Sequence, residues 1–537
     1  MRTGKVGIDH CVIPASPMAA GGDKEHRSGL IFFLLVSMLS AACQPVQSPS
    51  TGIPVLGATA SPTVIYTDVL PTSLSTDGLY PPSPTPYPTR PLYDPGELVD
   101  YIAQTGDSLP ALAIRFNTTV NEILAANSFI PASATTLPPG MPMKIPIYYL
   151  PFWGTPYQIL PDSLFVNGPE QVGFDTASFV ATTFGWLNGY REYASDQDRS
   201  GAQIIDLVAM NFSVSPRLLL ALLEYQSGAL NQSQTLTNTE YPLSYEDYAH
   251  KGLYLQLVWA ANTLNNGYYG WRTGRLTIFE LQGGRLERPD PWQNAASVAV
   301  QTYFSHLLSP DAYTKAISSD GIAKTYRDFF GDPWQDVQPH IPGSLAQPGF
   351  NLPFTEKQPW TLTGGPHTAW GDGDPLAAID FAPPGVKGCD TATEKSTAIA
   401  SGVVARSEPA IVVLDLDSLD AKADGDERTG WVIFYLHVGT DGRAAVGTRL
   451  EAGDAVGYPS CEGGRATGTH IHIARKYNGE WIPADSSLPF NLNGWTAHNG
   501  SAPYLGTLTR YSQTVTACTC SDQGSQIKAE PVKTPSP

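Results

Sequence analysis

Short apolar runs in the last third of the chain alternate with polar residues, and glycine- and aspartate-rich turns separate them. The clearest runs are AIVVLDLD (410–417), GWVIFYLHV (430–438) and THIHIARKY (469–477). Because side chains along a strand point alternately to its two faces, these runs predict β-strands. In the last run, His470 and His472 would share one face, with Ile471 and Ile473 on the other.

Residues 150–345 are predicted to form a mostly helical domain. Its best-marked helix is SPRLLLALLEYQSG, where Ser215 is an N-cap, Pro216 fits the first turn and Gly228 ends the helix. The stretch resembles the catalytic helix of lysozyme-like lytic transglycosylases. Gln226 stands where that family has its glutamate, and glutamine cannot supply the proton for glycosidic cleavage. We therefore expect no glycosidase activity here, and the role of the domain stays open.

Residues 97–149 read as strand, helix, helix, strand. Thr119 and Glu122 form a capping box at the start of the second helix. The segments GDSL, IRFNTTVNEILAAN and LPPGMPMKIP resemble a LysM domain. The resemblance implies a βααβ fold that binds N-acetylglucosamine-containing glycans such as peptidoglycan or chitin. A small α+β module of another kind is the alternative.

The first 43 residues are predicted to be an export signal. Lys24 and Arg27 precede the apolar run LIFFLLVSML, which is too short for a comfortable membrane span. The run ends in SAAC, and this pattern resembles a bacterial lipoprotein signal, which implies a lipid-anchored Cys43. A simple secretory signal is the alternative. Residues 44–96 are rich in Pro, Ser and Thr and are predicted to be an extended linker.

Length and charge narrow the function classes. The 537 residues exceed what one hydrophobic core supports, and the formal net charge of -18 disfavours nucleic acid as a partner. Apart from Cys11 and Cys43, the cysteines lie in the C-terminal third, which suits an oxidising compartment. They allow three disulfide pairings among Cys389, Cys461, Cys518 and Cys520.

Residues 346–500 contain the residue types of a zinc hydrolase. The strand runs predict an all-β antiparallel domain here. His367, Asp380 and His437 accompany the histidine pair at 470 and 472. Zinc hydrolases use three nitrogen or oxygen ligands and keep one position open for water.

In this order, the segments HTAWGDGDPLAAIDFAPPG, YLH and TGTHIH resemble the lysostaphin-like, or LytM-type, zinc endopeptidases of peptidoglycan. The resemblance implies that His367, Asp380 and His472 bind zinc. The long sequence separation between His367 and Asp380 is similar to that in the β-lytic branch of this peptidase family. Asp372 and Asp374 lie within this separation and could compete as oxygen ligands. We prefer Asp380 because the family motif DFAPPG begins there.

Two further roles follow from the same resemblance. His470 would handle the protons of the zinc-bound water and the leaving amine, and His437 would hydrogen-bond the oxyanion. We therefore predict a multidomain, exported peptidoglycan hydrolase, anchored at the membrane and facing the cell wall, with a C-terminal extension at 501–537 that ends in disorder. The alternative is a non-catalytic cell-wall-binding or scaffold lipoprotein with a degenerate or masked peptidase domain.

Overall fold

The computed structural model describes residues 92–233, 240–355, 357, 359–416, 422–520 and 522–529. The predicted signal peptide, Cys43 and almost the whole predicted linker lie outside the described residues, as do residues 530–537 at the end of the predicted C-terminal extension. The described residues belong to one compact unit of the chain. Within them, no helix has both the length and the apolar character to cross a membrane.

The first folded region has the predicted βααβ order. Its two strands pair antiparallel, with Glu97 opposite Ile147 and Ile102 opposite Pro142. The capping box is present, since Thr119 and Glu122 each bond the other's backbone amide. The elements are β1 (Glu97–Ile102), α1 (Leu109–Arg115), α2 (Val120–Ala126) and β2 (Pro142–Ile147).

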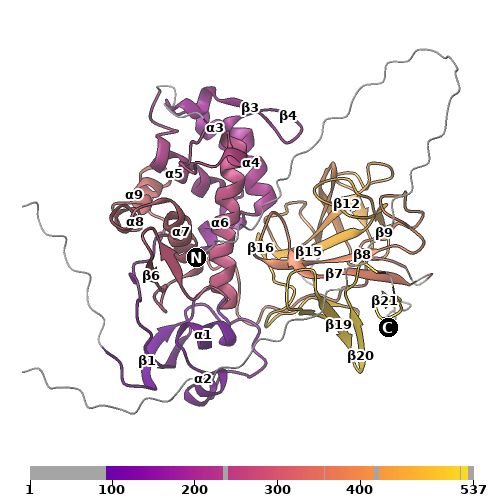
Figure 1. Cartoon of the computed structure of the whole chain (residues 1–537), viewed down its shortest axis with the longest axis horizontal. Coiled ribbons are helices and arrows are strands. Elements are labelled where there is room, and N and C mark those ends of the chain that lie inside the picture. Colours follow the sequence, from indigo (N-terminus) through magenta and orange to yellow (C-terminus); the bar gives the residue numbers. More distant parts are fainter. Residues whose placement is uncertain are drawn as a thin grey trace, which may run out of the picture. The chain divides into compact units, whose positions relative to one another are not determined.

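The middle region is mainly helical, as the apolar pattern predicts. The helix marked by its caps begins at Pro216 after the Ser215 cap and ends where Gly228 adopts a left-handed conformation. Figure 1 shows the long helix α6 at the centre of this region. The helices are α3 (Thr176–Ala181), α4 (Gly201–Phe212), α5 (Pro216–Ser227), α6 (Leu253–Thr273), α7 (Ala295–Leu307), α8 (Pro310–Ala316) and α9 (Ile322–Phe330).

Two small hairpins and four short 3-10 turns complete the described part of this region. The hairpins pair β3 (Arg191–Ala194) with β4 (Gln197–Ser200), and β5 (Phe279–Leu281) with β6 (Arg285–Glu287). The turns are η1 (Asp162–Leu164), η2 (Pro169–Gln171), η3 (Trp186–Gly189) and η4 (Tyr248–His250).

The C-terminal region is built on an antiparallel sheet with nine strands among the described residues, in the order β13-β10-β11-β12-β15-β8-β7-β21, with β16 paired to β15. Figure 1 shows β7, β8 and β15 side by side. The strands are β7 (Trp360–Thr368), β8 (Leu376–Ala382), β10 (Gly402–Glu408), β11 (Ala410–Leu416), β12 (Trp431–Val438), β13 (Arg449–Leu450), β15 (Ile471–Tyr477), β16 (Glu480–Trp481) and β21 (Gln526–Ile527).

Residues beyond 500 are part of the same β-structure, so the boundary expected there does not mark an edge of the core. Leu508, Val515 and Ile527 are buried in the same hydrophobic cluster as the main sheet. These residues are buried because a long-range strand pairing, β21 with β7, adds the end of the chain to the main sheet. The smaller sheets contain β17 (Asn491–Leu492), β18 (Trp495–Asn499), β19 (Gly506–Arg510) and β20 (Gln513–Thr516), and β9 (Ser396–Thr397) paired with β14 (Ala455–Gly457).

The two faces of the main sheet are buried against different partners. Ile471 and Ile473 pack into a core formed by the C-terminal region itself. Phe434 and Ala474, on the face that carries His472, instead share a hydrophobic cluster with the middle-region helices α4 to α7. The histidine-bearing face of the sheet is therefore also the face that packs against the helices.

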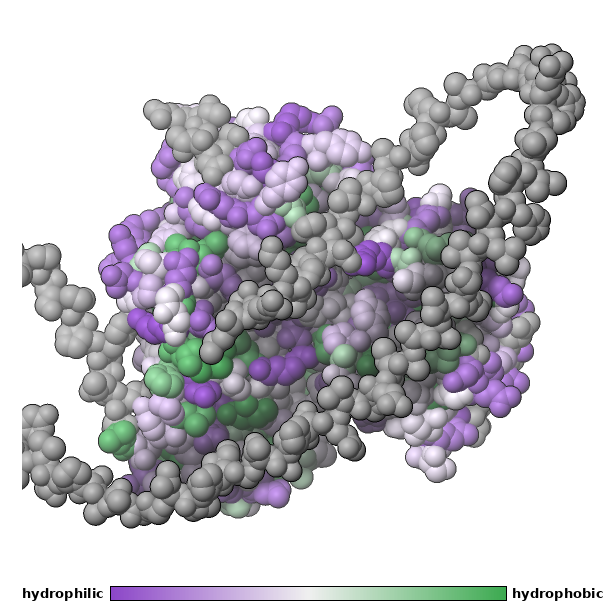
Figure 2. All heavy atoms as spheres, viewed as in Figure 1, coloured by the Kyte–Doolittle hydropathy of each residue, from purple (hydrophilic) through white to green (hydrophobic). Residues whose placement is uncertain are grey.

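The space-filling view in Figure 2 shows a mostly hydrophilic surface with separate green hydrophobic patches. Large hydrophobic side chains exposed on the first folded region include Leu98 and Ile102 of β1 and Ile114 of α1. Scattered exposure of this kind is normal in folded proteins, so it assigns no function by itself.

A buried polar cluster joins the helices to the sheet at Glu480. Its Oε2 accepts a hydrogen bond from the Tyr268 hydroxyl at 2.7 Å and lies 2.6 Å from His340 Nε2 and 3.2 Å from Arg272 Nη2. Arg272 also pairs with Asp162 at 3.1 Å. Burial alone would raise the pKa of Glu480, but the Arg272 charge and the hydrogen bonds lower it to about 2.

We predict that this cluster stabilises the fold only while Glu480 is ionised. A folded pKa of about 2, against about 4.5 for the free group, corresponds to about 3 kcal/mol above pH 5. This contribution is lost as the pH falls from about 4.5 toward 2. Glu480→Gln should lower the thermal unfolding midpoint at pH 7 far more than at pH 3. The partly exposed Glu408→Gln is the control, and a Glu480→Gln deficit of equal size at both pH values would contradict the prediction.

Candidate metal centre

Three side chains from neighbouring strands converge on one point of the histidine-bearing face. His472 of β15 lies directly opposite Asp380 of β8, and His367 of β7 lies opposite Ala378, two residues before Asp380. Directly opposed residues in antiparallel strands point to the same face. Strand pairing alone therefore brings the three predicted ligands together.

The three ligand atoms lie within hydrogen-bonding range of one another. Asp380 Oδ1 is 3.3 Å from His367 Nε2 and 3.3 Å from His472 Nδ1, and the two nitrogens are 3.0 Å apart. All three side chains are buried. Among the described residues, this His–Asp–His group is one of two whose donor atoms lie close enough to hold one metal ion. The other is Cys518, Cys520 and Asp522, in which both cysteines are used in a disulfide.

Backbone carbonyls determine which nitrogen of each ligand histidine carries the proton. His367 Nδ1 lies 2.8 Å from the Gly365 carbonyl oxygen, and His472 Nε2 lies 3.1 Å from the Ala369 carbonyl oxygen. A carbonyl can only accept, so each of these nitrogens donates its hydrogen. The other nitrogens, His367 Nε2 and His472 Nδ1, are left with lone pairs aimed at Asp380.

This arrangement fits a metal ion. Asp380 Oδ1 is buried and has no hydrogen-bond donor, which is costly for an ionised oxygen unless a cation lies beside it. Two imidazole nitrogens and one carboxylate oxygen are a typical ligand set for catalytic zinc. Carbonyls that orient the ligand histidines are the usual outer partners of such sites.

The charges of these groups reinforce one another. Burial alone would raise the pKa of Asp380, but the neighbouring His367 and His470 hold it well below its usual value. Burial lowers the pKa of His472, which favours the neutral ring that binds metal. Burial opposes protonation of His367, but the Asp380 carboxylate outweighs it and raises the pKa, so a proton competes with a metal ion for the lone pair of His367 Nε2.

The competing aspartates lie away from this point. The amide nitrogens of Asp372 and Asp374 donate to side chains of α6, and Asp374 forms an ion pair with Arg275. Neither aspartate belongs to the group that could hold a metal. The structure therefore brings Asp380, rather than Asp372 or Asp374, together with the two histidines.

His470 and His437 lie beside the ligand group. His470 Nε2 is 3.7 Å from Asp380 Oδ2, on the side of the carboxylate away from Oδ1. The ring centroids of His437 and His470 are 4.4 Å apart. Each ring donates its Nδ1 hydrogen to a carbonyl, of Glu462 for His437 and of Gly468 for His470. Their Nε2 atoms are therefore free to exchange protons with a bound molecule.

His437 adopts a left-handed backbone conformation, with φ of 64°, which is uncommon outside glycine. Burial, with His470 and His472 nearby, lowers its pKa to about 3, so the ring is neutral near pH 7. Because the neutral His437 ring carries its one hydrogen on Nδ1, where it is donated to the Glu462 carbonyl, Nε2 is an acceptor. Nε2 of His437 can donate to an oxyanion once it has taken up a proton, so the expected oxyanion role stays a prediction.

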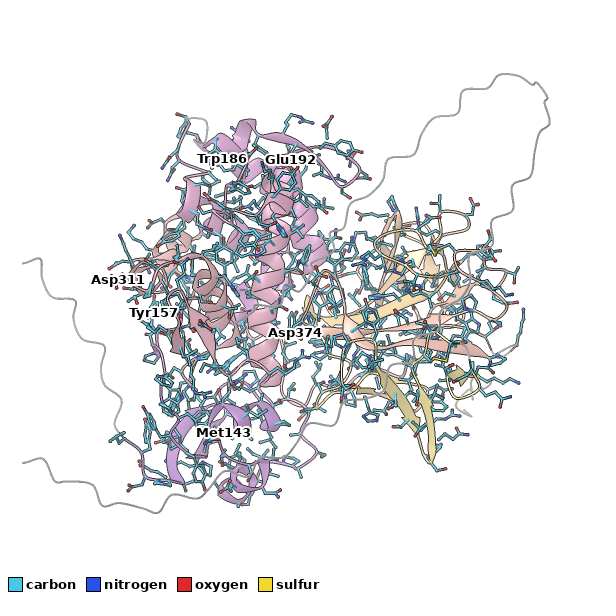
Figure 3. All side chains as sticks on the ribbon, in the orientation of Figure 1. Met143, Tyr157, Trp186, Glu192, Asp311 and Asp374 are labelled. Carbon is cyan, nitrogen blue, oxygen red and sulfur yellow. A yellow bond between two sulfur atoms is a disulfide. The ribbon has the colours of Figure 1, made fainter. Side chains whose placement is uncertain are left out.

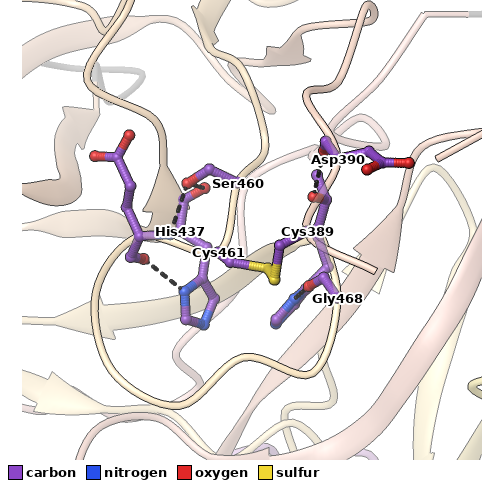
Figure 4. Close-up of a disulfide and its surroundings, with 9 residues drawn as sticks. Cys389, Asp390, His437, Ser460, Cys461 and Gly468 are labelled. Atoms are coloured by element: carbon purple, nitrogen blue, oxygen red, sulfur yellow. Dashed lines mark hydrogen bonds between the residues drawn. A yellow bond between two sulfur atoms is a disulfide. The ribbon is translucent and has the colours of Figure 1, made fainter. Parts of the chain in front are cut away.

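A disulfide joins two segments that lie beside these histidines. Figure 4 shows Cys389 bonded to Cys461, close to His437 and Gly468. On one side, the Thr469 amide donates to the Gly388 carbonyl at 2.7 Å. The observed pairings are Cys389 with Cys461 and Cys518 with Cys520, one of the three possibilities that the sequence left open.

Tyr504 is a site residue that sequence reasoning missed. Its ring stacks on His367 with centroids 4.1 Å apart, and its carbonyl accepts a hydrogen bond from the Gly365 amide at 2.8 Å. Burial and the Asp380 charge raise the pKa of its phenol, so it stays protonated at neutral pH. No local motif marks this tyrosine, because only the pairing of distant strands places it beside the site.

The fold and the His–Asp–His group together have the features of a metal-dependent peptidase, and comparison with known proteins agrees. Residues 158–343 match the model of the LasA N-terminal domain, and residues 101–146 match the LysM domain. Protease LasA of Pseudomonas aeruginosa (strain UCBPP-PA14) is 24% identical over 359 residues, which cover 63% of this chain and 79% of that protein. LasA from strain PAO1 matches with the same values.

Solved structures also match parts of the chain. The M23 metalloprotease pseudoalterin is 21% identical and covers 32% of this chain and 96% of its own, with a TM-score of 0.27. The catalytic domain of lysostaphin from Staphylococcus simulans is 18% identical and covers 23% and 87%, with a TM-score of 0.17. The domain matches and the LasA relatives confirm the inferred resemblance to the LytM-type peptidase family, together with a LysM domain.

We predict that the Cys389–Cys461 disulfide stabilises the fold substantially, because it closes a loop of 72 residues. Replacing both cysteines by serine should lower the free energy of unfolding by about 4 kcal/mol, according to the loop-entropy relation. The matched control is Cys518→Ser/Cys520→Ser. That bridge spans two residues, and its loss should cost about 1 kcal/mol. Equal losses in urea unfolding of the two variants would contradict the prediction.

Proposed function

We propose that this protein is an exported peptidoglycan hydrolase, a zinc-dependent endopeptidase that cleaves cell-wall peptides. One observation carries the proposal. The lone pairs of His367 Nε2 and His472 Nδ1 and the donor-less oxygen of Asp380 face one another within 3.3 Å in a buried place. Such a convergence of buried acceptors favours the binding of a cation.

The proposed chemistry divides among five side chains. His367, Asp380 and His472 hold the zinc, which when bound lowers the pKa of a water molecule toward 7 and polarises the scissile carbonyl. His437, neutral with a free Nε2 lone pair, can accept the proton of the attacking water. The proton that His437 takes up can pass to the neighbouring His470, whose ring centroid is 4.4 Å away, and His470 is placed to deliver it to the leaving amine.

The proposed substrate follows from the combination of domains. The LysM match supports binding to the glycan of peptidoglycan. The motif resemblance and the protease relatives support cleavage of its peptide. A glycan-binding domain on the same chain as the peptidase raises the effective concentration of the substrate at the metal centre. Attachment to the membrane through Cys43, and the extracytoplasmic location facing the wall, remain predictions of the N-terminal sequence.

A second candidate is a scaffold lipoprotein whose peptidase domain is masked. Its support is the burial of the site. The ligands His367, Asp380 and His472 are only 1%, 5% and 5% exposed, and the same sheet face packs against the helices. The complete ligand set argues for catalysis, since a scaffold has no need to retain it.

Glycosidase activity of the helical domain finds no support in its geometry. Gln226 is hydrogen-bonded to the Tyr303 hydroxyl and to the Leu243 carbonyl. The nearby Glu224 accepts hydrogen bonds from the Leu230 and Asn231 amides. Both side chains therefore have structural partners within their own domain.

The test is to measure zinc content and wall digestion on residues 44–537 and on the His472→Ala variant. The proposal predicts about one zinc per chain and release of new amino termini from peptidoglycan, both lost in the variant. His498→Ala is the matched histidine control, since His498 bonds Thr509 and is not part of the metal group.

Other outcomes would decide between the candidates. A zinc-loaded but inactive wild type, with zinc lost only in His472→Ala, would favour the masked scaffold. Release of new reducing ends that disappears in Glu224→Ala would identify a glycosidase. Absence of zinc from the folded wild-type protein would refute the metal centre itself.

A further inference from the structure

Helix α6 of the middle region contacts the loop that separates two of the metal ligands. This loop, residues 369–375, joins β7 to β8, which carry His367 and Asp380. Asn262 Oδ1 accepts a hydrogen bond from the Asp372 amide at 2.9 Å, and Asn266 Oδ1 accepts one from the Asp374 amide at 2.7 Å. Figure 3 labels Asp374 beside this helix.

The two asparagines of α6 match two glycines of the loop in spacing. Asn262 and Asn266 are four residues apart and so lie on the same face of α6. The loop has Gly371 and Gly373 opposite them, both with positive φ. A Cβ at either glycine would lie 2.2 Å from the oxygen of Asn262 or Asn266, respectively. The close approach of each asparagine therefore depends on the missing side chain of a glycine.

The same loop orients the third metal ligand. It begins with Ala369, whose carbonyl accepts the Nε2 hydrogen of His472 at 3.1 Å. The Ala369 amide in turn donates to the Pro375 carbonyl at 3.1 Å, which closes the base of the loop. A shift of the loop would therefore move the carbonyl that keeps His472 Nδ1 aimed at the metal.

Packing connects the loop to the same ligand by a second route. Trp370 lies with its ring edge-on to Phe212 of α4 and to Phe434 of β12, at centroid distances of 6.5 and 5.8 Å. Phe434 in turn lies edge-on to His472 at 6.2 Å. The middle region thus contacts this loop through both polar and aromatic groups.

We propose that Asn262 and Asn266 are positioning residues for the metal centre. They hold the 369–375 loop so that the Ala369 carbonyl fixes the orientation of His472. This inference rests on the proposed zinc site and adds a role for the middle region, which supplies part of the support of the metal ligands. The asparagines themselves do not touch the metal.

The test measures zinc affinity of the full chain by competition with a chelator, with zinc alone as the probe. Asn262→Leu/Asn266→Leu keeps the size of both side chains and removes both acceptors. We expect about tenfold weaker zinc binding, which is typical when a group that orients a metal ligand is lost. Asn262→Asp/Asn266→Asp keeps an acceptor oxygen at each position and should bind zinc with an affinity close to that of wild type.

Controls separate positioning from general damage. Asn188→Leu, a surface asparagine of the same region, should leave zinc affinity unchanged. The visible spectrum of the cobalt-substituted protein should change in the leucine double variant and match wild type in the aspartate one. If the double variant does not fold, the exposed Asn266→Leu alone replaces it, with a smaller loss of affinity expected.

The overturning results are distinct. Wild-type zinc affinity and an unchanged cobalt spectrum in the folded leucine variant would refute the positioning role and leave the proposed function intact. An equal loss in the leucine and aspartate variants would also refute it, because the acceptor oxygens would then not matter. No zinc binding by the wild-type chain would overturn both this inference and the proposed function.

Discussion

The structure depends most on the electrostatic repulsion among three buried acceptor atoms: His367 Nε2, His472 Nδ1 and Asp380 Oδ1. Carbonyl oxygens take the hydrogens of both ligand histidines, so His367 and His472 present lone pairs to Asp380. A buried place with three acceptors and no donor is unfavourable unless a cation occupies it. The fold maintains this arrangement, and much of the surrounding structure can be understood as its support.

That support comes from distant parts of the chain. The sheet supplies the spacing, because Asp380 and His472 are direct cross-strand partners. The segment around Tyr504 holds His367 by stacking and by a backbone hydrogen bond. The loop after β7 holds His472 and is itself contacted by α6. Both ligand histidines are thus held in part by segments other than their own strands.

Much of the architecture could be predicted from local patterns. The alternation around His470 and His472 correctly placed both rings on one face, where each approaches a different oxygen of Asp380. The capping box at Thr119 and the helix limits at Pro216 and Gly228 were also visible, because caps depend on residues only a few positions apart.

The remaining features depend on contacts between residues distant in the chain. Tyr504 reaches the site only through β-pairing beyond residue 500, where the sequence suggested an extension. The proton position on His437 depends on the Glu462 carbonyl, which no motif specifies. The asparagine–glycine contacts at α6 join residues more than a hundred positions apart. Composition and periodicity carry no information on such pairs.

The central claim is tested most directly by a crystal structure of the zinc-loaded protein, with anomalous scattering measured at the zinc edge. The account predicts one strong peak in bonding contact with His367 Nε2, Asp380 and His472 Nδ1, and none at Asp372 or Asp374. A peak coordinated by either of those two aspartates, or no peak among the three ligands at full zinc loading, would contradict it.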